Sequence, residues 1–333
     1  MAVLKSQRSG KVAVITTGGT IASRRHVTTG ALVSVDTGAE LLSSLGELAP
    51  PQEVVLEEFC KVGSNLIDLD LSFRLARRIE EFLREDCILG CVVTHGTDTL
   101  EESAFLANLV VSSSKPVVFT GSQHAADQSN ADGPRNLADA IRVAATPDAD
   151  GLGVVVVFDG KILSAVDATK VHTSRAMGFD SSGLGPLGEI DLDSVLITRR
   201  LSSYPRVDVA RIESRVDLLT LTMGADDRLF EAAVSLGARG IVLEAFGRGN
   251  GTREVVAAVS RATKKGIVTI VASRCLHGRV LPHYSDGGGR DLEAAGAIFA
   301  GRLRGPKARI LLCVALANAP EGGIAALFTQ FGR

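Results

Sequence analysis

The chain has 333 residues, of which 45% are hydrophobic and 22% are charged, and its formal net charge is −2. This composition is that of a globular protein, and a chain of this length buries roughly three-quarters of its unfolded surface, enough for two hydrophobic cores. The near-neutral charge, with no basic run interleaved with aromatic residues, gives no electrostatic support for nucleic-acid binding. A small-molecule partner is therefore the better expectation.

The five cysteines and six histidines follow neither metal-ligand spacing nor a redox Cys-x-x-Cys pattern. We therefore expect reduced thiols, no metal and no cofactor. The first ten residues contain no apolar stretch of signal-peptide length, and no later segment stays apolar over the length of a membrane span. These patterns predict a cytoplasmic protein with no membrane partner.

The first half of the chain alternates between β-branched apolar runs and helical patterns. Buried strands are predicted at 11–17, 88–94, 116–120 and 153–158, and helices at 98–111 and 134–146. Gly133 and Pro134 form a start signal for the second of these helices. The alternation predicts an α/β fold whose larger N-terminal domain is doubly wound around a mainly parallel sheet.

Residues 198–212 are polar, contain a proline and show no clear period, so a linker is predicted there. It would separate an N-terminal domain at 1–197, which carries the candidate catalytic motifs, from a smaller C-terminal α/β domain at 213–333. The strands expected in the second domain are 216–222, 240–245 and 267–272, and the expected helices are 226–236, 253–265, 291–300 and 308–317.

The segment Thr-Thr-Gly-Gly-Thr-Ile-Ala-Ser at 16–23 follows the first predicted strand. Open α/β sheets bind ligands at the carboxyl ends of their strands. Gly18 and Gly19 allow the backbone to approach a ligand closely and leave amide N–H groups free for an oxyanion, which makes Thr20 a candidate nucleophile. An ordinary glycine-rich turn is the alternative, and the segment lacks the Gly-x-Gly-x-x-Gly pattern of a dinucleotide site.

The segment Thr-His-Gly-Thr-Asp-Thr-Leu-Glu-Glu at 94–102 follows the second predicted strand. Asp98 and Glu101 have the spacing of a capping box that opens the next helix, but this interpretation does not account for Thr97. A hydroxyl beside a carboxylate could orient water or a nucleophile, and Asp98 could hold a substrate ammonium group. His95 ends a strand, so we expect a buried, hydrogen-bonded histidine in preference to a general base.

Lys170 lies beyond the strand at 153–158 and a hairpin-like Asp159-Gly160 pair. Most lysines are solvated surface charges, but burial beside a hydroxyl could make this one a base. The sequence leaves open whether Lys170 reaches Thr97. The segments Gly63-Ser64-Asn65 and Gly121-Ser122 are, by composition alone, ordinary turns.

Together, residues 17–22 and 95–102 resemble the two signature segments of the bacterial L-asparaginase family, whose members hydrolyse asparagine to aspartate and ammonia. The resemblance extends in chain order over nearly the whole chain, through residues 63–64, 131–134, 136–137, 167–170 and 249–251.

The resemblance implies hydrolysis of the side-chain amide of L-asparagine with Thr20 as the nucleophile. It implies a supporting triad of Thr97, Asp98 and Lys170, and it implies that Ser64 and Asp98 hold the α-carboxylate and α-ammonium of the substrate. The other substrate-binding residues that it implies are Gly19, Asn65, Gly96, Thr97 and Gly121.

The resemblance also implies a homotetramer built from close dimers. Each active site would lie between the N-terminal domain of one subunit and the C-terminal domain of its neighbour. Asn250 and Tyr284 are the candidate contributions from that neighbour.

The chain departs from the family pattern at three places. The family usually has a tyrosine in the mobile loop after the first motif, but the tyrosines here are Tyr204 and Tyr284. Our hypothesis is that Tyr284 enters the site from the partner domain. Asn65 stands where the family commonly has glutamine and Thr252 stands where asparagine often follows Gly-Asn-Gly, so we expect altered substrate placement.

Other functions stay open at this point. A non-catalytic amino-acid-binding or sensing homologue would keep the ligand contacts, although it would not need a lysine beside a second hydroxyl. An amidase for a related amide, such as L-glutamine or D-asparagine, would use the same residues. An amidase acting on aminoacyl-tRNA is disfavoured because no RNA-binding module or basic run accompanies the motifs.

Overall fold

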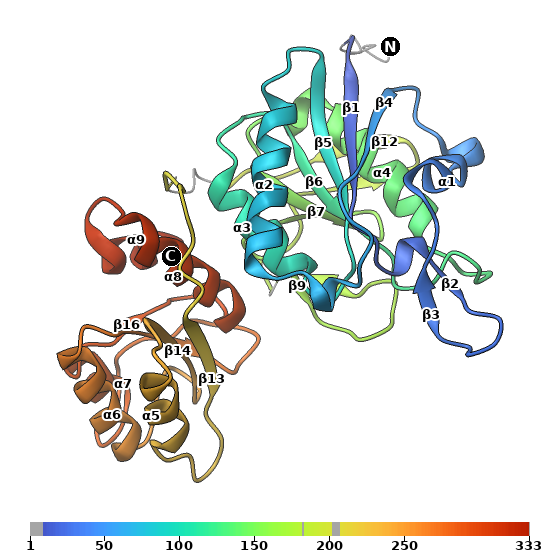
Figure 1. Ribbon diagram of the computed structural model, residues 1–333. Helices are drawn as coiled ribbons and strands as arrows, with labels where there is room; N and C mark the ends of the chain where they lie inside the picture. The colour runs from blue at the N-terminus through green and yellow to red at the C-terminus, as the bar shows by residue number, and fades with distance from the viewer. Residues whose placement is uncertain (1–8, 182, 202–206, 333) are drawn as a thin grey trace. The chain divides into compact units, whose positions relative to one another are not determined.

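The computed structural model describes residues 9–181, 183–201 and 207–332. The chain divides into two compact units, Met1–Ser202 and Ser203–Arg333 (Figure 1). The predicted linker at 198–212 includes residues outside the described part, and its limits stay a prediction.

An eight-stranded sheet forms the centre of the first unit, in the order β12-β11-β8-β7-β6-β5-β1-β4. Five neighbouring strands run parallel: β4 (Glu53–Glu58), β1 (Lys11–Thr16), β5 (Ile88–Thr94), β6 (Val117–Thr120) and β7 (Val154–Phe158). Three antiparallel strands extend it: β8 (Lys161–Ser164), β11 (Gly188–Asp191) and β12 (Ser194–Ile197). The mainly parallel sheet is confirmed, whereas the antiparallel extension was not predicted.

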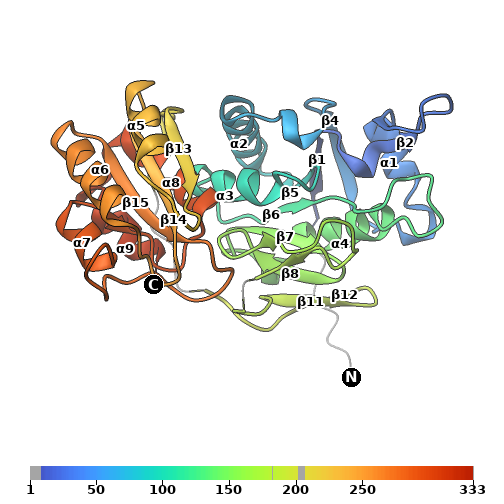
Figure 2. The same ribbon diagram turned by 90° about the horizontal axis from the view of Figure 1, so that it is seen from below.

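Helices cover both faces of this sheet, which is why its central strands are continuous apolar runs. Helices α2 (Leu69–Leu83) and α3 (Leu100–Val110) pack on one face and α4 (Gly133–Ala145) packs on the other (Figures 1 and 2). Alternate residues of a strand face opposite sides, and Val12 and Val92 lie in one core cluster with Leu137 of α4. The predicted doubly wound arrangement is therefore confirmed.

Short elements complete the first unit. Strands β2 (Ser23–Arg25) and β3 (Leu32–Ser34) pair as a hairpin after the first motif, and β9 (Thr169–Lys170) pairs with β10 (Phe179–Asp180). The remaining short elements are η1 (Thr20–Ala22), α1 (Gly38–Ser43), η2 (Gly46–Leu48), η3 (Ser64–Leu66) and η4 (Pro147–Ala149). Strands β7 and β8 pair across Asp159 and Gly160, so the hairpin expected there is confirmed.

The second unit has a parallel sheet of β13 (Val216–Thr220), β14 (Gly240–Ala245), β15 (Val268–Ser273) and β16 (Ile298–Phe299). Its helices are α5 (Arg228–Ser235), α6 (Arg253–Lys264), α7 (Gly289–Ala294), α8 (Gly305–Asn318) and α9 (Gly323–Phe331). The smaller C-terminal α/β unit is confirmed.

One predicted helix of the second unit is wrong. The helix expected at 291–300 ends at Ala294, and Ile298–Phe299 pairs with β15 as a strand. Gly296, with a φ of +101°, turns the chain between them, and this left-handed conformation does not continue a right-handed helix. Helix α9 was not predicted.

Across residues 9–181, 183–201 and 207–332, no helix has the length and apolar character needed to cross a membrane.

Candidate active site

Apart from Lys170, which lies in β9, the predicted site residues of the first unit follow the carboxyl ends of neighbouring strands. Strands β4, β1, β5 and β6 end in register, with Thr16 of β1 opposite Glu58 and Thr94, and Thr94 opposite Thr120. The edge of a parallel sheet where the strands end is where such folds bind ligands. The loops that follow these four strands carry, in turn, Ser64, Thr20, Thr97 and Gly121.

The two glycine-rich motifs lie in direct contact. Gly19 has a φ of +84°, and a Cβ at this position would collide with the backbone of Gly96. A side chain is therefore excluded by both conformation and space. A Cβ at Gly96 would in turn lie 2.7 Å from Oγ of Ser64. Thr20 follows Gly19, half-buried at the start of η1, so its loop packs against the loops of Ser64 and Thr97.

Lys170 bridges Thr97 and Asp98. Its Nζ lies 2.8 Å from Oγ1 of Thr97 and 2.8 Å from Oδ1 of Asp98. Thr97 is 5% exposed, whereas the side chains of Lys170 and Asp98 are 19% and 65% exposed. The amine thus reaches from an accessible carboxylate to a buried hydroxyl. The contact between Lys170 and Thr97, which the sequence left open, is present in the structure.

The backbone of Lys170 is anchored by the helix that follows the second motif. The amide N–H of Lys170 donates to Oε2 of Glu101 at 2.7 Å. The predicted capping box is therefore wrong: α3 begins at Leu100 after Thr99, with no side-chain hydrogen bond at its N-cap. Both carboxylates accept hydrogen bonds from Lys170, which is distant in sequence: Asp98 from its amine and Glu101 from its backbone amide.

Ser64 joins the β4 loop to the second motif. Its Oγ accepts a hydrogen bond from the amide of Asp98 at 3.1 Å, and its carbonyl accepts one from Oγ1 of Thr99 at 2.8 Å. Ser64 is 3% exposed, and its neighbour Asn65 is exposed. A Cβ at Gly63 would lie 2.6 Å from Oδ1 of Asn65, so the shortened amide folds back over its own loop.

The half-buried carboxylate of Asp132 orders the loop after β6. Asp132 accepts hydrogen bonds from Oγ of Ser122 at 2.6 Å and from the amides of Gln123 at 3.1 Å and His124 at 2.9 Å. Gly121 is held from the other side, because its carbonyl accepts from Nδ2 of Asn136 at 3.0 Å. This ordering was missed from the sequence, where the residues resembled an ordinary turn. Asp132 lies ten residues beyond Ser122, so no local sequence pattern predicts the hydrogen bond between them.

His95 is fully buried, and its Nδ1 lies 2.8 Å from the carbonyl of Gly96. Burial lowers the pKa of His95 to about 4, so the ring is neutral near pH 7 and its Nδ1–H donates to that carbonyl. Nε2 has no hydrogen-bond partner among the described residues. The expectation of a buried, hydrogen-bonded histidine is confirmed.

The candidate partner contributions belong to the second unit. Oδ1 of Asn250 accepts from the amide of Gly289 at 3.2 Å, at the start of α7. Tyr284 is 53% exposed and its ring stands edge-on to His283. Thr252 caps α6 through a 3.3 Å bond from the amide of Val255, which gives the unusual threonine a structural role. Tyr204 lies outside the described residues, and the partner roles of Asn250 and Tyr284 stay predictions.

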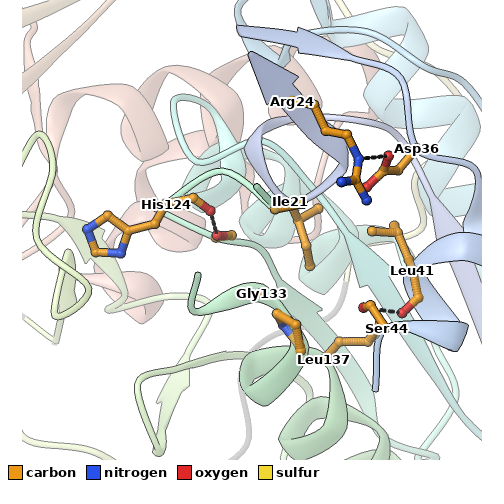
Figure 3. Close-up of a pocket in the computed structure, with 11 residues that line it drawn as sticks. Ile21, Arg24, Asp36, Leu41, Ser44, His124, Gly133 and Leu137 are labelled. Atoms are coloured by element: carbon orange, nitrogen blue, oxygen red, sulfur yellow. Dashed lines mark hydrogen bonds and ion pairs between the residues drawn. The ribbon is translucent and has the colours of Figure 1, made fainter. Parts of the chain in front are cut away.

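A small pocket of about 50 Å³ lies beside the first motif, between the β2–β3 hairpin, α1 and the start of α4. Figure 3 shows Arg24 paired with Asp36 at one side of it, and the ring of His124 turned away from the other labelled side chains. Neither Thr20, Thr97 nor Lys170 lines this pocket. It borders the candidate site but does not hold the reactive groups.

The described part of the chain brings together no group of three or more His, Cys, Asp and Glu side chains that could hold a metal ion. The side chains near Thr97 at this edge of the sheet supply hydroxyls, an amine and a carboxylate.

Two family descriptions match the chain. Residues 11–203 match "Asparaginase, N-terminal" and residues 215–325 match "Glutaminase/Asparaginase C-terminal domain". The crystal structure of a probable cytoplasmic L-asparaginase from Campylobacter jejuni has a TM-score of 0.86 and 29% identity, over 96% of this chain and 99% of that one.

The curated relatives that match this chain are named either as L-asparaginases or as glutamyl-tRNA(Gln) amidotransferase components. An L-asparaginase of Bacillus licheniformis is 36% identical over 94% of this chain and 97% of the relative, and L-asparaginase 2 of Bacillus subtilis is 36% identical over 96% and 86%. A glutamyl-tRNA(Gln) amidotransferase component of Methanosarcina mazei is 33% identical over 86% of this chain but 69% of the relative. On these matches, with both glycine-rich motifs in contact at one edge of the sheet, the chain belongs to the asparaginase family.

Proposed function

We propose that the protein hydrolyses the side-chain amide of L-asparagine to L-aspartate and ammonia. The observation that carries this proposal is the pair of 2.8 Å contacts from Lys170 Nζ to the hydroxyl of Thr97 and the carboxylate of Asp98. Relatives named L-asparaginase that match over nearly the whole chain support it.

Thr20 is the nucleophile in this proposal. Its Oγ1 forms a bond to the side-chain carbonyl carbon of asparagine, and the C–N bond then breaks to release ammonia. Water attacks the resulting ester, which yields aspartate and restores the threonine hydroxyl. In this proposal, backbone amides of the two glycine-rich loops, which contact one another at Gly19 and Gly96, donate to the oxyanion, and loss of one such donor commonly costs about 3–4 kcal/mol.

Thr97 and Lys170 move the protons that these steps require. Thr97, hydrogen-bonded to Nζ of Lys170 at 2.8 Å, takes the proton of the attacking group, and the Thr97–Lys170 pair returns a proton to the leaving nitrogen, which departs as ammonia. General-base assistance of this kind contributes about 10²–10⁴-fold in rate. The exposed Asp98 carboxylate binds the α-ammonium of the substrate and Ser64 binds its α-carboxylate, so the two charges of the amino acid are held at fixed positions.

The test is ammonia release from L-asparagine, D-asparagine and L-glutamine by the purified protein, with L-aspartate binding measured by calorimetry. Release from L-asparagine at the highest kcat/KM supports the proposal. A preference for one of the other amides would assign the same site to that substrate. Binding of aspartate with no release from any amide would make the chain an amino-acid-binding homologue.

The aminoacyl-tRNA amidase alternative has one observation in its favour, the relatives named as glutamyl-tRNA(Gln) amidotransferase components. This chain spans about 70% of their length. The near end-to-end match with the L-asparaginase of Bacillus licheniformis favours a free amino acid as substrate.

Three further expectations belong to this proposal. The protein is a homotetramer of close dimers, in which Asn250 and Tyr284 complete the active site of a neighbouring subunit, and full activity of Tyr284→Phe would reject that role for the tyrosine hydroxyl. It is cytoplasmic, as the Campylobacter jejuni protein is by name, although a Haemophilus influenzae relative is named periplasmic. Its domains are residues 1–197 and 213–333.

A further inference from the structure

We infer that Gln123 is a positioning residue. It holds the hydroxyl of Thr97 and the β9–β10 hairpin, which carries Lys170, at the separation that the reaction requires. This inference rests on the proposed function. Gln123 lies in the loop after β6, and its side chain extends between two segments that are distant in sequence. Oε1 of Gln123 lies 3.4 Å from Oγ1 of Thr97, and Nε2 lies 3.4 Å from the carbonyl of His172. Each end of the amide thus faces one half of the Thr97–Lys170 pair.

The hydroxyl proton of Thr97 needs an acceptor. Oγ1 of Thr97 accepts a hydrogen bond from Nζ of Lys170 at 2.8 Å when the amine is protonated, so its own proton must point elsewhere. Oε1 of Gln123 is the acceptor that the structure offers. At 3.4 Å this bond is longer than an ordinary O–H···O hydrogen bond, so it orients the hydroxyl and still lets it turn during proton transfer.

Lys170 lies in a hairpin whose loop is closed by its own hydrogen bonds. Strands β9 and β10 pair through Lys170 and Phe179, and the loop between them is closed by the ring of His172, whose Nδ1 accepts from the amides of Ser174 and Arg175 at 3.0 Å. Because these hydrogen bonds close the loop, a contact at the carbonyl of His172 restrains the position of the whole β9–β10 hairpin. Gln123 is therefore placed to fix the distance between this hairpin and Thr97.

Two features hold the glutamine amide in place. The backbone N–H of Gln123 donates to the Asp132 carboxylate at 3.1 Å, which fixes the start of the side chain. At the other end, Gly178 is buried, and a Cβ there would collide with Nε2 of Gln123. The amide is packed against a position that has room only for a hydrogen atom, so its location depends on Gly178 as well as on its hydrogen bonds.

The experiment compares Gln123→Met with Gln128→Met. The two glutamines lie in the same loop, and Gln128 uses Oε1 to accept from the amide of Ala125 at 3.2 Å, with no contact to Thr97. We expect Gln123→Met to lower kcat for L-asparagine roughly tenfold, with KM changed by less than about twofold, because it disturbs reacting groups and not substrate contacts. Gln128→Met is expected to keep the wild-type kcat.

Gly178→Ala provides a second variant that leaves the glutamine in place but displaces its amide. We expect it to lower kcat as Gln123→Met does, with thermal stability of both variants close to that of Gln128→Met. A kcat for Gln123→Met equal to that of Gln128→Met overturns the inference. So does a kcat loss that only follows a loss of folded protein.

A crystal structure of Gln123→Met separates this inference from the proposed function. We expect the Lys170 Nζ to Thr97 Oγ1 distance to lengthen beyond hydrogen-bonding range. A contact that remains at 2.8 Å, as in the wild type, would contradict the positioning role whether or not the enzyme is active. Absence of ammonia release by the wild-type protein, in contrast, would count against the proposed function alone.

Discussion

Burial sets the protonation state of His95, which lies between strand β5 and the loop that carries Thr97. Its pKa is lowered to about 4 because the protonated ring would be desolvated, while an unfolded histidine titrates near 6.5. The unfolded chain therefore binds a proton at this residue over a pH range in which the folded chain does not. Stability from this group is fully present above about pH 6.5 and is lost as the pH falls towards about 4.

The expected loss at pH 4 relative to pH 7 is about 3 kcal/mol of unfolding free energy for His95 alone. Because carboxylates also titrate in this range, the measurement is the difference between wild type and His95→Gln in urea unfolding at several pH values. We predict a shallower pH dependence for the variant. Parallel curves for the two proteins would show that His95 is not buried in its neutral form.

The ion pair of Lys170 and Asp98 has little weight as a source of stability. Asp98 is 65% exposed, and exposed pairs typically contribute no more than about 1 kcal/mol. Its position beside the buried Thr97 hydroxyl is better explained by chemistry. Substitution of Lys170 or Asp98 is therefore expected to lower activity far more than it lowers the free energy of unfolding.

At the scale of elements, helix α3 and the β9–β10 hairpin are joined through Glu101, whose carboxylate accepts from the amide of Lys170 at 2.7 Å. We predict that Glu101→Ala lowers kcat for L-asparagine by about one to two orders of magnitude, because small displacements of a catalytic group cost this much. Glu101→Gln keeps an acceptor oxygen and should retain most activity. Steady-state kinetics of both variants check this, and equal activities for Ala and Gln would disprove the anchor.

Sequence patterns predicted the elements that are continuous in the chain. Strands β1 and β5 are long β-branched runs buried on both faces, and α4 begins at Gly133 where the start signal lies, so each is specified locally. Strands β9 and β10 have two residues each and depend on pairing with one another, which no local period reveals. They carry Lys170, so the least predictable element holds a candidate catalytic residue.

The candidate site shows the same division. The carboxyl-end positions of Thr20 and Thr97 followed from the strands, and the contact between Lys170 and Thr97 came from family resemblance, because it joins residues 73 apart. The capping-box interpretation of Asp98 and Glu101 failed because both carboxylates bind Lys170 instead of the helix start. Gln123 was not predicted as a site residue because its partners, Thr97 and His172, come from two other loops.

For the whole molecule, we propose that residues of a neighbouring subunit complete each site, so activity would require more than one chain. Sedimentation equilibrium is expected to give four times the 34.8 kDa mass of one chain. Ammonia release should fall when dilution dissociates the assembly. A fully active monomer would contradict the shared site and would remove Asn250 and Tyr284 from consideration as partner residues.

If Thr20 attacks asparagine while Thr97 and Lys170 act as one proton-transfer unit, a double-mutant cycle on kcat for L-asparagine should reveal the coupling of Thr97 and Lys170. The proteins compared are wild type, Thr97→Val, Lys170→Met and the double variant, with Thr20→Ala as the variant without a nucleophile. Residues that act as a unit give non-additive losses. We predict that each single variant loses at least about 10²-fold and that the double variant is no slower than the slower single one. Losses that multiply in the double variant, or near-normal activity in Lys170→Met or Thr20→Ala, would contradict the account.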